Sequence, residues 1–251
     1  MYPILEFDPH PGSILNPSAV KLSEPTPKRA VICFFLDVLK QLAEEDHLRV
    51  IGGLKWETGI HQLYLLEHKG EPVLVFHPGV GAPLAAGLME DVIALGCDRF
   101  IACGGCGSLR PEISAGHPVV VTAAVRDEGT SYHYIPASRE LAADPRGVAA
   151  IESACRESGV DYRLGKTWTT DAPYRETTAK REMRLAEGCD VVEMEASAFI
   201  AVAQFRSVLF GQILYSGDLV VPEGWDHRNW DHRLDDRRLL FDLAVAAVLK
   251  L

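Results

Sequence analysis

The sequence predicts an α/β protein in which helices cover a mixed or parallel β-sheet. Short apolar runs typical of buried strands recur along the chain, and segments with helical spacing of apolar residues lie between them. The chain has 251 residues, of which 47% are hydrophobic and 24% charged, so it can bury a substantial core. This length fits one large domain or two small ones.

Regular structure is expected to begin at residue 29. Residues 1–28 are rich in proline and lack a clear period, which predicts an extended N-terminal arm ahead of an α/β domain at residues 29–251. The run RAVICFF predicts a buried strand at residues 29–35, and DVLKQLAEE predicts a helix after it. Residues 62–67 and 72–77 predict two strands joined by the turn HKGE.

The middle of the chain predicts a helix between two strands. Pro83 suits the first helical position, and Gly96 is expected to end the helix. DRFIAC predicts the next strand at residues 98–103, which the glycine turn GGCG at residues 104–107 should end. HPVVVTAAV predicts another strand at residues 117–125.

The last third of the chain continues the alternation. Helices are predicted at residues 147–159, 196–205 and from about 235 to 249. VVEME leads into the second of these helices, and VLFGQILY predicts the last strand at residues 208–215.

Charge and the first residues exclude several classes of function. The net charge is −10, so the surface repels phosphate backbones and a general nucleic-acid binder is not expected, although a local basic pocket could hold a small anion. The start MYPILEFDPHPG has acids and prolines where a signal peptide needs basic and apolar regions. No apolar run approaches the roughly 20 residues of a membrane span. A cytoplasmic protein without membrane contact is therefore expected.

Cysteines and histidines predict neither a metal site nor a disulfide framework. The six cysteines lie mostly in apolar segments and are interpreted as reduced core thiols. Cys103 and Cys106 match CxxC, but no second pair exists, so a tight glycine turn with incidental cysteines is favoured over a redox or zinc site. The segment WDHRNWDHR at residues 225–233 is interpreted as solvated and polar.

Two glutamates interrupt the apolar stretch CDVVEMEASAFIAVAQF. A buried carboxylate without partners costs several kcal/mol, so Glu193 and Glu195 need a reason to be there. On a strand they share one face. One interpretation is a pair of strand-end carboxylates that caps the next helix. The other is a carboxylate that grips the vicinal hydroxyls of a sugar and favours positive charge developing on it.

Two glycine segments predict a crevice at one edge of the sheet. Residues 79–81 (GVG) do not match the dinucleotide fingerprint, because APL follows where its last glycine should fall. These glycines still allow close backbone approach at a strand-to-helix turn. Together with residues 104–107 they place two glycine segments at strand ends, which is where open α/β sheets bind ligands.

Longer motifs carry a resemblance to a known family. VVEMEASAF resembles the ribose-binding motif of the nucleoside phosphorylase superfamily, which holds uridine phosphorylase, hexameric purine nucleoside phosphorylase and methylthioadenosine nucleosidases. Residues 77–113 resemble the central block of that family throughout, and RDEGTSYHY and TTDAPYRET resemble its base- and sugar-bordering segments. The resemblance covers most of residues 70–220. It implies a single domain with a twisted mixed central sheet flanked by helices, assembled as a homodimer or as a hexamer of three dimers.

The resemblance also implies roles for individual residues around the sugar. Glu195 would be the catalytic carboxylate that binds the ribose 2′- and 3′-hydroxyls, with Met194 packed on the sugar and Glu193 beside it. Thr130 and His133 would line the same sugar pocket.

At the base, Tyr174 would stack on the ring and Arg175 would donate to a carbonyl oxygen. Asp218 matches the aspartate that protonates a leaving purine, with an extra glycine in the local spacing. His10 corresponds to a histidine that relatives send into the neighbouring subunit's site. Arg175 favours a pyrimidine and Asp218 a purine, so the base stays open.

The phosphate site departs from the family pattern. Residues 35–37 (FLD) stand where phosphorolytic members have a glycine-aspartate-proline loop, and Val38 and Ala102 stand where they have arginines. Gly105 replaces a threonine, and Lys55 is the nearest counterpart of an arginine from the adjacent subunit.

A weaker anion site remains the expectation. Backbone N–H groups from Gly104 and Gly105, with Lys55 or Arg126, would form an anion nest. The hypothesis is therefore a nucleoside phosphorylase-like pentosyltransferase, with inorganic phosphate as co-substrate and no other cofactor. One alternative is a hydrolytic nucleosidase on the same fold, although the glutamate that activates water in such enzymes is not recognisable. A second is a non-catalytic nucleoside-binding protein.

Overall fold

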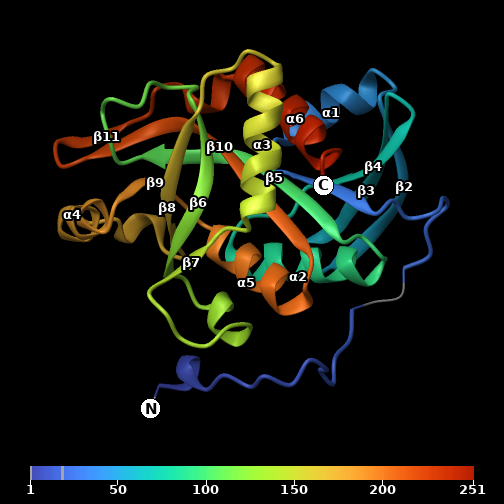
Figure 1. Ribbon diagram of the computed structural model, residues 1–251, viewed down its shortest axis with the longest axis horizontal. Coiled ribbons are helices and arrows are strands. Elements are labelled where there is room, and N and C mark those ends of the chain that lie inside the picture. Colours follow the sequence, from blue (N-terminus) through green and yellow to red (C-terminus); the bar gives the residue numbers. More distant parts are fainter. Residues whose placement is uncertain (1, 18–19) are drawn as a thin grey trace.

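The strands that the structure describes pair into one mixed sheet (Figure 1). The computed structural model describes residues 2–17 and 20–251. The eleven strands in these residues are β1 Arg29–Cys33, β2 Leu48–Trp56, β3 Gly59–His68, β4 Glu71–Phe76, β5 Arg99–Ser108, β6 Pro118–Asp127, β7 Glu140–Ala142, β8 Arg163–Thr170, β9 Cys189–Glu193, β10 Leu209–Val221 and β11 Gly224–Asp226. The helices are α1 Leu36–Glu44, α2 Ala82–Ala94, α3 Pro145–Glu157, α4 Thr178–Ala186, α5 Ala196–Arg206 and α6 Leu234–Val248.

Part of the sheet closes on itself. Strand β10 pairs with β5 in parallel and with β6 in antiparallel orientation, and the ring returns to β5 through β8 and β9. Strands β1, β4, β3 and β2 extend from β5 as an open sheet. Because β1 is parallel to both β4 and β5, the carboxyl ends of these three strands meet at one edge.

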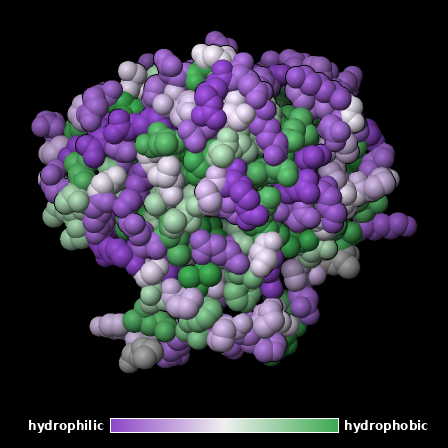
Figure 2. Space-filling model, in the orientation of Figure 1, coloured by the Kyte–Doolittle hydropathy of each residue, from purple (hydrophilic) through white to green (hydrophobic). Residues whose placement is uncertain are grey.

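Helices cover both faces of the sheet and bury it completely at the centre. One apolar cluster lies beneath α2 and α5, and a second lies beneath α1, α3 and α6. Strands β1 and β5 contribute residues to both clusters, as expected for strands that are buried on both faces. The predicted α/β class with a mixed sheet is confirmed. Figure 2 shows hydrophilic and hydrophobic residues interspersed over one face of the molecule.

Most of the predicted elements are confirmed, and several polar ones escaped prediction. The confirmed strands are β1, β3, β4, β5, β6 and β10, and the confirmed helices are α1, α2, α3, α5 and α6. Strands β2, β7, β8 and β11 and helix α4 were missed. Strand β8 carries buried threonines among its apolar residues, and α4 buries two arginines in place of an apolar stripe.

The prediction of a glycine turn at residues 104–107 is wrong. These residues continue strand β5, and Gly104 and Gly105 lie opposite Leu214 and Tyr215 of β10. The missing side chains make room for aromatic rings. A Cβ on Gly104 would lie 3.0 Å from the ring of Phe34, and one on Gly105 would lie 3.3 Å from the ring of Tyr215.

The N-terminal segment follows the surface of the body. Within residues 2–17, a short 3₁₀ helix, η1 (Pro3–Leu5), interrupts an otherwise irregular backbone. Further along, the Ser23 N–H donates to the carbonyl oxygen of Ile51, and Cys97 donates to that of Pro27. Among the described residues, no helix combines the length and the apolar character that crossing a bilayer requires.

The thiols are enclosed in the core. All six cysteines are buried and unpaired. Burial raises the pKa of Cys103 and Cys106 well above the ordinary value, so neither ionises readily near neutral pH. Over residues 2–17 and 20–251, no three histidine, cysteine, aspartate or glutamate side chains cluster as metal ligands would.

Candidate active site

Glu193 supports the turn that leads from β9 into α5. Its Oε2 atom accepts hydrogen bonds from the N–H groups of Glu195 at 2.7 Å and Ala196 at 2.6 Å. Its Oε1 atom accepts from the hydroxyls of Thr169 at 2.6 Å and Thr167 at 3.2 Å. Burial raises the pKa of Glu193, and these four hydrogen bonds oppose the rise. Both oxygens bind the protein, as the helix-capping interpretation expects, so Glu193 holds the turn in place.

Glu195 is buried with fewer partners from the chain. It occupies the N-cap position of α5 without capping it, and its Oε1 atom accepts from the Gly81 N–H at 2.5 Å. Burial, and then the charge of Glu193, raise the pKa of Glu195 to about 8. A carboxylate in this state gains from any further donor that approaches it, such as a sugar hydroxyl. Met194, which precedes it, is half-buried.

Aromatic side chains fill the edge where β1, β4 and β5 end. The Phe34 ring lies edge-on to His77 and to Phe199, with centroids 6.2 Å and 6.3 Å apart. It also packs on the backbone of Gly104. The predicted anion nest does not form here, because Gly104 and Gly105 pair with β10 in an extended strand.

The Arg126 guanidinium donates its hydrogen bonds to other residues of the chain. Its guanidinium donates to the Ser131 and Ser138 hydroxyls at 2.9 Å, and to the carbonyl oxygens of Ile135 and Pro136 at 3.0 and 2.8 Å. It is 4% exposed and stacks on Tyr132. These bonds fold the loop after β6, and they contradict the expectation that Arg126 faces an anion.

Removal of these bonds is expected to destabilise the protein. Arg126→Met should lower the unfolding free energy by about 2–4 kcal/mol, because buried carbonyl and hydroxyl groups lose their donors. Denaturant unfolding measures this loss, with Arg156→Met as the control, since the Arg156 side chain is 60% exposed and pairs with Glu152 at the surface. Unchanged stability together with a loss of phosphate dependence would restore the anion role.

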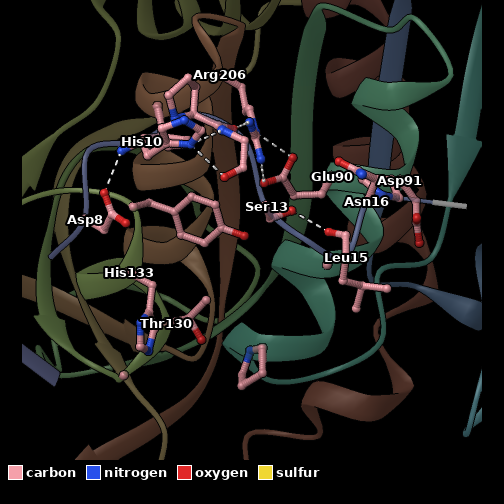
Figure 3. A pocket seen from close by; sticks show the side chains of 18 of the residues that line it. Asp8, His10, Ser13, Leu15, Asn16, Glu90, Asp91, Thr130, His133 and Arg206 are labelled. Carbon is pink, nitrogen blue, oxygen red and sulfur yellow. Dashed lines mark hydrogen bonds and ion pairs between the residues drawn. The ribbon is translucent and has the colours of Figure 1, made fainter. Parts of the chain in front are cut away.

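A cavity of about 1000 Å³ lies between the N-terminal segment and the body (Figure 3). Four of the predicted site residues line it: His10, Lys55, Thr130 and His133. Thr130 and His133 come from the 3₁₀ helix η2 (Thr130–His133), and His10 comes from the arm.

The cavity reaches toward the glutamate without including it. Asp171 lines its wall and accepts from the Gly129 N–H at 2.8 Å. The charge of Asp171 also contributes to the raised pKa of Glu195. Asp171 therefore lines the same cavity as Thr130 and His133 and interacts electrostatically with Glu195.

The base candidates project from the 3₁₀ helix η3 (Pro173–Arg175). Tyr174 is 99% exposed, and Arg175 is exposed beside it. The next residue, Glu176, is half-buried, and burial followed by the charge of Asp218 raises its pKa to about 7. Asp218 accepts from the Trp225 indole N–H at 2.5 Å. An acidic pair, Glu176 and Asp218, thus stands near the exposed candidates.

Comparison with known proteins decides the family. The model of the phosphorylase superfamily matches residues 28–250. The chain belongs to the phosphorylase superfamily.

Relatives with curated names are similar over part of their length. A uridine phosphorylase of Thermococcus kodakarensis is 37% identical over 121 residues, which are 47% of this chain and 44% of that protein. A guanosine phosphorylase of Halorubrum lacusprofundi is 27% identical over 61% of this chain and 64% of its own length. The two matches thus span 44% and 64% of the length of these curated relatives.

Solved structures agree with the superfamily fold. A purine nucleoside phosphorylase from Toxoplasma gondii, in complex with immucillin-H, superimposes with a TM-score of 0.74 at 21% identity and covers 89% of this chain and 92% of its own. An AMP nucleosidase from Bacteroides thetaiotaomicron gives a TM-score of 0.70 at 22% identity, covering 89% and 87%. At these identities the likeness concerns the fold.

Sequence reasoning within the phosphorylase superfamily missed several residues of the site. The missed residues lie next to predicted site residues, either in the sequence or in space: they are Phe34, His77, Asp171 and Glu176. Asp171 and Glu176 lie inside the motif TTDAPYRET. Their carboxyl groups were overlooked because Tyr174 and Arg175 were chosen from this motif as the residues that contact the base. His77 is the first residue of the block at residues 77–113, but its contact with Phe34 follows only from the parallel pairing of β1 with β4.

Proposed function

We propose that this chain cleaves the N-glycosidic bond of a nucleoside, with inorganic phosphate as the acceptor and no other cofactor. The observation that carries the proposal is the buried Glu195 carboxyl group, which a turn fixed by Glu193 holds at the start of α5. Membership of the phosphorylase superfamily supports the same reaction class.

In the proposed reaction the ionised Glu195 accepts hydrogen bonds from the ribose 2′- and 3′-hydroxyls. Its negative charge favours the positive charge that develops on the sugar as the bond to the base breaks. Met194, Thr130 and His133 would enclose the sugar. Tyr174 would stack on the base and Arg175 would donate to it, and the Glu176–Asp218 pair would supply a proton to a leaving purine.

Phosphorolysis and hydrolysis begin with the same bond. The C1′–N bond breaks, and its electron pair leaves with the base, which takes a proton. A phosphate oxygen then bonds to C1′ and gives ribose 1-phosphate, and the phosphate gives up a proton that balances the one taken by the base. If water attacks C1′ instead, it loses a proton and the product is free ribose.

Hydrolysis is the second candidate, and a specific observation favours it. The Phe34 ring packs on Gly104, and the two positions where phosphorolytic members have arginines, Val38 and Ala102, are fully buried. Lys55 is exposed and offers a point charge rather than a bidentate clamp. We therefore expect phosphate to bind in the millimolar range or more weakly, by order of magnitude.

A panel of nucleosides incubated with and without phosphate tests the proposal. Free base and ribose 1-phosphate that increase with phosphate are expected, with separation of the products by chromatography. Free ribose at the same rate without phosphate would assign hydrolysis. If no purine or pyrimidine nucleoside releases its base, the result would favour the alternative of a non-catalytic nucleoside-binding protein.

The proposed assembly is a homodimer or a hexamer of three dimers. His10 and Tyr174 are both exposed, so either can reach a second copy of the chain. Sedimentation at micromolar concentration tests this assembly, and a monomer that remains fully active would contradict it. We also propose a cytoplasmic location and the division into an arm at residues 1–28 and a domain at residues 29–251.

A further inference from the structure

We propose that His77 is a positioning residue that holds the turn from β4 to α2 against the Glu195 carboxyl group. The kinetic consequence rests on the proposed function, but the contact itself does not. Three observations carry the inference: the turn contains two glycines with positive φ, the His77 ring accepts a hydrogen bond from inside it, and the turn supplies the N–H group that donates to Glu195.

The turn contains two glycines in unusual conformations. Gly79 has φ +75° and Gly81 has φ +94°, values that L side chains rarely adopt. A Cβ on Gly79 would lie 2.2 Å from the Leu84 side chain, so glycine is required there. Because glycine gives the unfolded turn many conformations, a contact is needed to hold this one.

His77 supplies that contact. Its Nδ1 atom accepts the Gly79 N–H at 3.0 Å, which in a neutral ring places the proton on Nε2. Edge-on packing against the Phe34 ring, with centroids 6.2 Å apart, also holds the imidazole. Burial lowers the pKa of His77, and nearby His61 lowers it further, so the ring stays neutral and can accept at neutral pH.

Gly81, at the end of the turn, supplies the N–H group that donates to Glu195. The Gly81 N–H lies 2.5 Å from Glu195 Oε1, 114 residues away in the chain. This bond favours the ionised carboxylate, and so it lowers the pKa of Glu195 against the effects of burial, Glu193 and Asp171. If His77 no longer holds the turn, Gly81 should move away, and Glu195 should become harder to ionise.

Two matched variants test the contact. His77→Phe keeps a ring against Phe34 but removes the acceptor. His77→Asn loses the ring, yet its side-chain oxygen can accept the N–H two residues ahead, as asparagine does in turns. We expect His77→Phe to raise the pKa of Glu195 by about one unit, roughly the effect of one hydrogen bond to a charged group. His77→Asn should restore most of the shift.

The readout is the titration of Glu195 itself. Carbon-13 labelled glutamate, followed by NMR from pH 5 to 10, reports this pKa, and Glu195→Gln identifies the signal. An active enzyme should show the same displacement in the pH dependence of kcat/KM. A titration that is unchanged in His77→Phe, or equally displaced in both variants, overturns the proposal. If His77→Phe does not fold, His77→Ala takes its place.

The two proposals can fail separately. If no nucleoside is cleaved but the Glu195 titration moves as expected, the proposed function fails and the role of His77 stands. If cleavage occurs and the titration does not move, only the role of His77 fails.

Discussion

Replacement of Glu195 by glutamine is expected to lower kcat/KM by about 10²–10³-fold, the usual loss when one group that stabilises transition-state charge is removed. Glutamine has the same shape, and its oxygen can still accept the Gly81 N–H. At low pH, where the carboxyl group is protonated in both the folded and the unfolded state, the unfolding free energy should therefore change by only about 1 kcal/mol or less. Steady-state kinetics and denaturant unfolding measure the two quantities.

The same carboxyl group should set a pH dependence. Its pKa of about 8 in the folded protein exceeds the ordinary value of 4.5, because burial and Glu193 disfavour the charge. The folded state therefore binds the proton more tightly than the unfolded state. The stability contribution is fully present below about pH 4.5 and is lost as the pH rises through 8. If the ionised form holds the ribose, kcat/KM should rise over the upper part of that range.

A control variant separates the effects of the Glu195 carboxyl group from nonspecific effects of replacing a glutamate. Glu182→Gln removes a carboxylate whose side chain is 58% exposed, so neither the kinetics nor the pH dependence should change. Glu195→Gln should also remove the decline of stability toward pH 8. Near-normal kcat/KM in Glu195→Gln would rule out the ribose clamp, whatever its effect on stability.

The sequence predicted the layers of the fold because apolar residues decide them. Strands such as β1 are continuous apolar runs, and α2 and α5 bury small apolar residues on the sheet. Strand β8 is different, since its buried Thr167 and Thr169 look polar in the sequence but donate to Glu193 inside the protein. A residue whose partner lies 24 or 26 positions away cannot be interpreted from local pattern alone.

Sequence motifs predicted part of the candidate site, whereas the residues that strand pairing brings together were missed. On a strand, Glu193 and Glu195 would share one face. The chain instead leaves β9 after Glu193, so the Glu193 carboxylate accepts the N–H groups of Glu195 and Ala196, whereas the Glu195 carboxylate accepts that of Gly81. The segment GGCG suggested a loop because glycine breaks strands. The aromatic rings that require glycine there come from β10 and from the end of β1.

The acidic pair near the proposed base site leads to the other large effect. Asp218→Asn is expected to lower kcat/KM for purine nucleosides by about 10²–10⁴-fold, the usual range for general acid catalysis, and to leave any uridine activity nearly intact. A purine leaves with a proton on its ring, whereas a uracil leaving group can be stabilised by hydrogen bonds to its carbonyl oxygens. Kinetics on both classes of nucleoside measure the selectivity.

The neighbouring carboxylate decides which residue holds the proton. Burial, and then the charge of Asp218, raise the pKa of Glu176 to about 7, so ionisation of one carboxyl group disfavours ionisation of the other. A proton shared by the pair at neutral pH would be the one that the leaving purine takes. Purine activity should then fall as the pH rises above 7, and loss of the Asp218 charge should lower the pKa of Glu176.

Glu176→Gln completes the comparison. If Glu176 holds the proton, this variant should lose purine activity as strongly as Asp218→Asn, and the double variant should lose little more, because the two residues act as one donor. If Asp218 alone is the acid, Glu176→Gln should keep most of the activity. Equal losses on purine and pyrimidine nucleosides in both variants would make the pair structural, with Asp218 serving to hold Trp225 through its indole N–H.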